Sequence, residues 1–187
     1  MKGKKELPNW AKHGRSHWEY YGQKRPSFAI EPKKWQESVW DYPRPPKIEH
    51  DSREIIVKYG DIIIAKTVSA IRILETASPP TFYIPTNDID LNWLHKTTQS
   101  SRCEWKGEAV YWDLIVYDQI IHQASWSYES PFEDYNDIGG FLSFYPSKME
   151  CYIGEERVRP QPGGFYGGWI TNEIVGPVKG EDPRAYL

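Results

Sequence analysis

The sequence predicts a mainly β protein, a compact antiparallel β domain of two packed sheets with little helix. Short runs of β-branched and aromatic residues, several of them alternating with polar residues, are typical of half-buried strands. Glycine, proline and aspartate separate these runs at short intervals, as turns of an antiparallel sheet do. The 187 residues and their 39% hydrophobic content exclude general disorder and provide enough apolar surface for a folded domain.

Charge and aromatic content divide the chain into three predicted parts. Residues 1–47 hold 11 Lys and Arg against 5 Asp and Glu, with four tryptophans and few aliphatic residues. This composition is typical of a basic arm that packs across a domain through its aromatic rings. We expect residues 48–150 to form a single β-rich domain, and the Gly- and Pro-rich residues 151–187 to form a tail packed on it.

The first predicted hairpin turns at Gly60-Asp61, between two runs of β-branched residues. Glycine supplies the positive φ that tight hairpin turns require. A two-residue turn at this point places five alternating apolar side chains on one face of the hairpin. These residues form the predicted core face: Ile55, Val57, Tyr59, Ile62 and Ile64.

Two shorter segments follow the hairpin. Residues 69–75 allow two interpretations, because their apolar positions fit either one helical turn or a strand. Pro79-Pro80 ends this segment, since proline blocks the continuation of a helix. Residues 81–84 form a short predicted strand, which Pro85 closes.

The clearest predicted strand pair covers residues 109–117 and 120–128. A three-residue connection, 117–119, brings the apolar faces of the two strands together, whereas a two-residue connection would separate them. Residues 140–145 form a further predicted strand. The apolar faces consist of Val110, Trp112, Leu114 and Val116 in the first strand, and Ile120, Ala124, Trp126 and Tyr128 in the second.

A string of motifs over about residues 53–149 resembles the family called domain of unknown function 427, which is sometimes labelled nucleotidyltransferase-like. The resemblance implies a compact β fold of the β-tent type and no established activity. The flanking segments resemble the long form of the family, with an aromatic arm before the domain and a glycine-rich tail after it. The family usually has Cys-Pro where this chain has Cys103-Glu104. The matching residues are Ile62-Ile63-Ile64-Ala65, Glu75, Tyr83-Ile84-Pro85, Asp88, Cys103-Glu104-Trp105-Lys106-Gly107, Tyr111-Trp112, Trp126-Ser127-Tyr128, Pro131 and Phe144-Tyr145.

Cys103 and Lys106 are the candidates for reactive or ligand-binding chemistry. A cation stands on each side of the thiol in sequence, and nearby cations favour the reactive thiolate, although a buried cysteine also packs as a small hydrophobe. A lysine before a glycine on a loop can present its ammonium to an anionic ligand. A pair between Lys106 and Glu75 or Asp88 explains the same lysine without any ligand.

The segment Asp88-Ile89-Asp90 has the spacing with which nucleotidyltransferases hold two metal ions. On a strand, both carboxylates would share one face. These enzymes also need a Gly-Ser loop upstream to hold the triphosphate, and none precedes Asp88. A helix cap or an Asx turn is therefore the favoured interpretation, and the sequence predicts no metal site.

Two functions from different classes fit these residues. The first is a small-molecule-binding β domain whose pocket has aromatic walls and a few charged groups. The alternative is an enzyme that uses Cys103 or Lys106 as nucleophile and a carboxylate as acid or base. The sequence assigns no catalytic residue and no cofactor. The predicted ligand-binding residues are Glu75, Tyr83, Asp88, Cys103, Lys106, Trp112, Trp126 and Tyr128.

Partners and location follow from composition. The net charge of −3 makes nucleic acid an unlikely partner, and the longest aliphatic run, Ile62-Ile63-Ile64-Ala65, is far shorter than a membrane span. The N-terminus lacks the apolar segment of a secretory signal and the chain has only two cysteines, which predicts a cytoplasmic protein. If the arm reaches a neighbouring molecule instead of its own domain, it would make a homo-oligomer.

Overall fold

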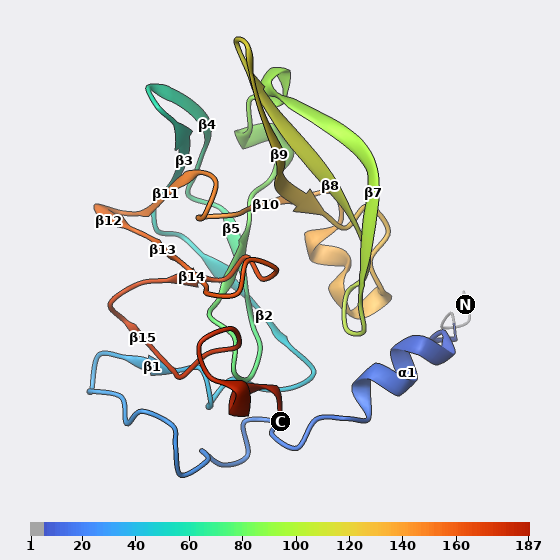
Figure 1. Ribbon diagram of the computed structural model, residues 1–187, viewed down its shortest axis with the longest axis vertical. Helices are drawn as coiled ribbons and strands as arrows, with labels where there is room; N and C mark the ends of the chain where they lie inside the picture. The colour runs from blue at the N-terminus through green and yellow to red at the C-terminus, as the bar shows by residue number, and fades with distance from the viewer. Residues whose placement is uncertain (1–5) are drawn as a thin grey trace.

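A computed structural model describes residues 6–187 and confirms the predicted fold class, a mainly β protein built from several antiparallel sheets (Figure 1). Residues 1–5 of the predicted arm lie outside the described residues. Three larger sheets make up the domain, and of two short strand pairs one joins the arm to the tail and the other lies within the tail.

The first sheet has the order β12-β11-β3-β4 and contains the predicted hairpin. Tyr59 pairs with Ile62 across a turn in which Gly60 has a φ of 57°, so the predicted turn at Gly60-Asp61 is confirmed. Its core face is buried at Ile55, Val57 and Ile64, as the alternation predicted. The strands are β3 (Ile55–Tyr59), β4 (Ile62–Thr67), β11 (Glu150–Ile153) and β12 (Glu156–Arg157).

The second sheet has the order β2-β5-β6 and settles the two interpretations of residues 69–75. This segment is a strand, and it is the central one of the sheet. Its side chains are buried on both faces, at Ile71 and Ile73 on one side and at Ala70 and Leu74 on the other. Apolar side chains on both faces, with Arg72 as the one polar residue between Ala70 and Leu74, explain why the sequence showed no clear period of two here. The strands are β2 (Lys47–Asp51), β5 (Ala70–Leu74) and β6 (Thr81–Tyr83).

The third sheet has the order β10-β9-β8-β7, and its long β8–β9 hairpin extends from the rest of the molecule (Figure 1). Val116 pairs with Gln119, so the connection is a two-residue turn and the predicted three-residue connection is wrong. Tyr117 adopts a φ of 51°, a left-handed conformation without a glycine to signal it. The strands are β7 (Leu94–Cys103), β8 (Gly107–Val116), β9 (Gln119–Ser127) and β10 (Leu142–Phe144).

The shorter turn changes the faces of the second strand of this hairpin. Ile120 is 55% exposed, so its predicted core position is wrong, and Ile121 packs against the core instead. An irregularity in the pairing then follows, with a φ of 51° at Gln123. A bulge inserts unpaired residues and therefore resets which side chains face the core. Beyond it Ala124 and Trp126 are buried, as predicted.

The second and third sheets meet at one edge. The backbone amide of Ile84 donates to the carbonyl of Leu142 at 2.8 Å, and the amide of Leu142 donates back at 3.1 Å. This bridge connects the end of β6 to β10. The two sheets are therefore joined along one edge. Side chains from both sheets line the space between their faces.

The arm and the tail pack on each other and on the domain. β1 in the arm pairs in parallel with β15 in the tail, and Trp40 donates through its Nε1 to the carbonyl oxygen of Pro177 at 3.1 Å. No helix within residues 6–187 has the length and apolar character to cross a membrane. The remaining elements are α1 (Asn9–Arg15), β1 (Glu37–Ser38), β13 (Arg159–Pro160), β14 (Trp169–Ile170) and β15 (Ile174–Val175), with 3-10 helices at Thr86–Asp88, Leu91–Trp93, Glu133–Ile138 and Pro183–Tyr186.

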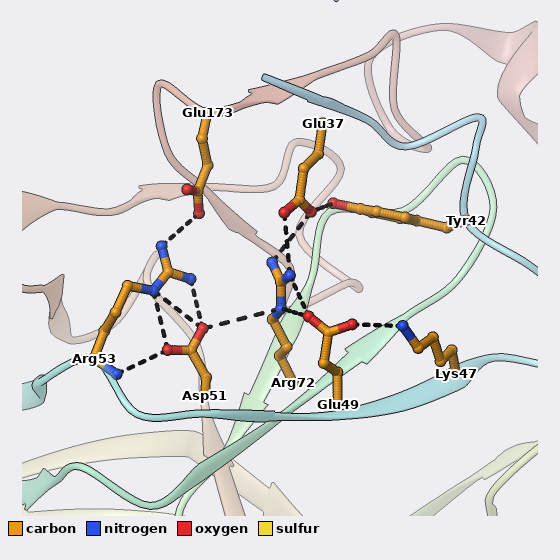
Figure 2. Close-up of polar contacts among 8 residues, drawn as sticks. All are labelled: Glu37, Tyr42, Lys47, Glu49, Asp51, Arg53, Arg72 and Glu173. Carbon is orange, nitrogen blue, oxygen red and sulfur yellow. Dashed lines mark hydrogen bonds and ion pairs between the residues drawn. The ribbon is translucent and has the colours of Figure 1, made fainter. Parts of the chain in front are cut away.

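A network of ion pairs joins these segments on the outer face of the second sheet (Figure 2). Arg72 on β5 donates to Glu49 on β2 and to Glu37 on β1 in the arm. Arg53 donates to Asp51 on β2 and to Glu173 in the tail. Because each guanidinium bonds two segments at once, the network fixes the arm and the tail against the sheet.

Candidate functional site

A cavity of about 280 Å³ lies between the second and third sheets. β5 and β6 provide one wall, and the ends of β7, β8 and β9 provide the other. The arm and the tail supply further lining from outside the sheets. The residues that carry its chemistry are Glu75, Lys106, Lys179, Cys103, Glu104 and Arg102, with the aromatic side chains Trp18, Tyr83, Tyr111, Trp126, Tyr128, Tyr145, Phe165 and Tyr166.

Glu75 is the centre of a buried cluster of charges. It follows directly after β5, and its side chain is 13% exposed. Lys179 in the tail donates to its Oε1 at 3.1 Å, and the Nε of the fully buried Arg44 lies 3.6 Å from the same oxygen. The Nζ of Lys106 lies 4.0 Å from Oε2. Three cations therefore surround one carboxylate.

The cluster sets the protonation of its members. Burial alone would raise the pKa of Glu75. The positive charges of Lys179, Lys106 and Arg44 outweigh this effect and lower the pKa to about 2. Burial alone would lower the pKa of Lys106, but Cys103, Tyr83 and Glu75 beside it raise that pKa above its ordinary value. At neutral pH the site therefore holds a carboxylate and an ammonium.

Lys106 is positioned by a tight turn between β7 and β8. Cys103 pairs with Gly107, which has a φ of 107° that a side chain would strain. The carbonyl of Lys106 accepts from the amide of Phe132 at 3.0 Å, and Trp105 is buried next to it. The lysine side chain is only 10% exposed, and within the described part of the chain no acceptor lies within hydrogen-bond distance of its Nζ.

Aromatic side chains form the walls around this ammonium. Trp126 on β9 donates through Nε1 to the hydroxyl of Tyr83 at 3.2 Å, and its ring centroid lies 4.5 Å from that of Tyr145. Tyr111 on β8 pairs with Trp126 and so lies on the same face. Burial raises the pKa of Tyr83 and of Tyr128 well above neutral pH, so both hydroxyls keep their protons.

The arm and the tail close the cavity. Trp18 in the arm donates through Nε1 to Oε1 of Glu104 at 3.0 Å. Its ring contacts two cations, with the guanidinium carbon of Arg44 3.7 Å and Nζ of Lys179 4.2 Å from the ring centroid. In the tail, a β-carbon on Gly167 would lie only 2.2 Å from the ring of Trp126, so this close approach requires glycine.

The structure brings six of the eight predicted ligand-binding residues together at the cavity: Glu75, Tyr83, Cys103, Lys106, Trp126 and Tyr128. Trp112 lies on the opposite face of β8, where its Nε1 donates to Ser127 Oγ at 3.0 Å. Its neighbour Tyr111 occupies the cavity side, because adjacent residues of a strand point to opposite faces. Asp88 also lies away from the cavity, and its carboxylate accepts from Thr67 Oγ1 at 2.5 Å.

The segment Asp88-Ile89-Asp90 is not a strand. Asp88 ends the 3-10 helix Thr86–Asp88, and the Asp90 side chain accepts from the amide of Asn92 at the start of the next one. The two carboxylates therefore serve separate local structures. Within residues 6–187, no group of three or more His, Cys, Asp or Glu side chains is placed to hold a metal ion.

Sequence reasoning missed Lys179, Arg44, Trp18 and Tyr145 as parts of the site. Lys179 and Trp18 come from the predicted tail and arm, more than 100 and 50 residues from Glu75 along the chain. Nothing local to either residue distinguishes it from a surface lysine or a packing tryptophan. Tyr145 was the one with a signal, because Phe144-Tyr145 belongs to the motif string that predicted the family.

The lowered pKa of Glu75 predicts a loss of stability in acid. Its carboxyl has an ordinary value of 4.5 in the unfolded chain and about 2 in the folded protein. The stabilisation is therefore complete above about pH 4.5 and is lost as the pH falls towards 2. We expect this group to contribute about 3 kcal/mol, measured by urea unfolding at a series of pH values and constant ionic strength. A free energy of unfolding that stays level between pH 5 and 3 would contradict this assignment.

A comparison with protein families finds one that matches the sequence of this domain. The family model NTP_transf_9, described as "Domain of unknown function (DUF427)", matches residues 47–155, which is more than half of the chain. A search of the curated proteins finds no match to the sequence. The matched region contains both sheet walls of the cavity, whereas Trp18, Arg44 and Lys179 lie outside it.

Proposed function

We propose that this chain, which belongs to the DUF427 family, binds a small anionic molecule in the cavity between its second and third sheets. The observation that carries the proposal is the ammonium of Lys106. It is nine-tenths buried, it lines the cavity, and its nearest carboxylate oxygen is 4.0 Å away. A buried ammonium without a hydrogen-bonded acceptor costs free energy, and a bound anion would supply that acceptor.

The balance of charge around the cavity supports an anion. Lys106, Lys179 and Arg44 face one largely buried carboxylate, that of Glu75. Buried charges in proteins are usually paired, so the surplus of positive charge favours a negatively charged ligand. Mostly aromatic walls with a few convergent charged groups are also the usual construction of small-molecule sites.

A purely structural role for Lys106 is less well supported. In that interpretation Lys106 would be the partner of Glu75, but Lys179 already donates to that carboxylate at 3.1 Å. Arg44 lies against the same oxygen at 3.6 Å. Glu75 therefore has its partners without Lys106, whose side chain lines the cavity and makes no hydrogen bond among the described residues.

The enzyme alternative lacks groups for proton transfer. Lys106 holds its proton and therefore is a poor nucleophile or base, and Glu75 with a pKa of about 2 is a poor acid at neutral pH. Cys103 lines the cavity, but among the described residues no histidine or carboxylate is hydrogen-bonded to its thiol. The separate positions of Asp88 and Asp90 also give no support to two-metal nucleotidyl transfer.

The proposal predicts that Lys106→Met removes ligand binding and leaves the fold intact. We expect a melting temperature within a few degrees of the wild type, because Glu75 keeps Lys179 and Arg44 as partners. The measurement is a thermal-shift screen of small carboxylates, sulfate, phosphate and phosphate esters. Anions that stabilise the wild type should no longer stabilise the variant.

The matched control is Lys66→Met, since Lys66 is 55% exposed and, among residues 6–187, pairs only with the exposed Glu54. This variant should keep every ligand-induced shift of the wild type. A Lys106→Met protein that melts more than about 10 °C lower would assign Lys106 to structure. Equal anion-induced shifts in Lys106→Met and the wild type would place the ligand elsewhere.

A further inference from the structure

The size of the cavity limits what it can hold. Its 280 Å³ equal the liquid volume of about nine water molecules, and lie just below the usual range for drug-sized ligands. A nucleoside triphosphate is much larger than this space. A single ring with one small charged substituent matches it.

The charges limit the ligand to a single negative charge. Besides the cluster around Glu75, the cavity contains the carboxylate of Glu104, which accepts from Trp18. Lys179 and Arg44 are paired with Glu75, and Arg102 at the cavity is exposed to solvent, so Lys106 is the buried cation left for a ligand among the described residues of the site. The carboxylate of Glu75 lies 4.0 Å from the ammonium of Lys106, which would receive the first negative charge of the ligand. A second negative charge on the ligand would lie close to Glu75 and be repelled by it.

The donors available match a carboxylate. The hydroxyl of Tyr83 accepts from Trp126 Nε1, so its own proton remains to be donated. A carboxylate can receive a charge-assisted hydrogen bond from the ammonium of Lys106, whereas the fully buried Tyr83 belongs to the packed wall behind it.

The walls match an aromatic ring. Trp126 and Tyr145 pack with ring centroids 4.5 Å apart, and Tyr83 lies edge-on to Trp126 at 6.2 Å. Tyr111 and Tyr128 complete a lining in which aromatic surface surrounds the charged end of the cavity. Ring faces and edges attract another ring more strongly than a saturated group of the same size.

We infer that the ligand is a small aromatic monocarboxylate, held through its carboxylate by Lys106 and through its ring by Trp126 and its aromatic neighbours. This inference rests on the proposed function and narrows it to one class of anion. It also gives the arm and the tail a part in specificity, because Trp18 and Lys179 line the same cavity.

Isothermal titration calorimetry at pH 7.5 tests the class with five probes: benzoate, cyclohexanecarboxylate, acetate, phenyl phosphate and inorganic phosphate. We expect benzoate to bind at least tenfold more tightly than each of the others. At a hundredfold excess over its Kd it should raise the melting temperature by about 5–10 °C. Tyr145→Leu, or Tyr111→Leu as a second variant, should remove the advantage of benzoate over cyclohexanecarboxylate, while acetate should still bind through Lys106.

The outcomes separate this inference from the proposed function. If either phosphate binds as tightly as benzoate, and Lys106→Met abolishes this binding, the aromatic carboxylate is wrong and the anion site stands. If cyclohexanecarboxylate equals benzoate, the ring is not recognised and the inference is also overturned. If none of the five probes binds the wild type, and the wider anion screen of the proposed function is negative too, both fail together.

Discussion

Replacing Glu75 with glutamine is expected to lower the free energy of unfolding by about 3–5 kcal/mol. Glutamine has nearly the same shape, so the change removes charge and not packing. It leaves the cations of Lys106, Lys179 and Arg44 buried without a carboxylate. An uncompensated buried charge is among the few causes of so large an effect from a conservative substitution.

Urea unfolding at pH 7 measures the effect, and two further variants make it specific. Glu54→Gln is the matched control, because Glu54 is an exposed partner of the exposed Lys66 and its change should cost less than about 1 kcal/mol. Adding Lys179→Met to Glu75→Gln removes the cation together with its partner and should restore part of the lost stability. A cost below about 1 kcal/mol for Glu75→Gln would show that the cluster is well solvated and would weaken the case for an anion site.

The β fold could be predicted because its signals are local. Gly60-Asp61 between alternating residues specifies a hairpin whatever the rest of the chain does. The register of the β8–β9 hairpin was not predictable in this way. Its two-residue turn and its bulge place Tyr117 and Gln123 at positive φ, which neither residue type signals. Tertiary packing on the core face selects that register, as the burial of Ala124 beyond the bulge illustrates.

The sheet walls of the candidate site could be predicted from the sequence, but the residues that the arm and the tail contribute could not. Tyr83, Lys106 and Trp126 lie in motifs of the family, and the matched region contains both sheet walls. The partners that set the chemistry of Glu75 come from the arm and the tail, at Arg44 and Lys179. A contact between residues so far apart along the chain depends on the whole fold, and composition alone does not specify it.

The contact between the arm and the tail is expected to stabilise the folded protein and to support ligand binding. Trp40 is fully buried where the arm, the end of β5 and the tail meet. Its ring contacts Tyr20 and Phe28 edge-on, with centroids 5.4 and 5.2 Å away, and its Nε1 donates to the carbonyl of Pro177. We expect Trp40→Ala to lower the free energy of unfolding by about 3–5 kcal/mol, because it leaves a large cavity and an unpaired carbonyl.

Trp35→Ala is the control, since Trp35 is a tryptophan of the same arm that is 60% exposed, and its change should cost less than about 0.5 kcal/mol. If the arm folds as one unit with the domain, Trp40→Ala should also weaken anion binding, because the same segment carries Trp18 and Arg44 into the site. Urea unfolding and titration with benzoate measure the two effects on one sample. A Trp40→Ala protein that unfolds like the wild type would show that the packing of the arm contributes nothing to the stability of the domain. The arm could then not be relied on to hold Trp18 at the cavity.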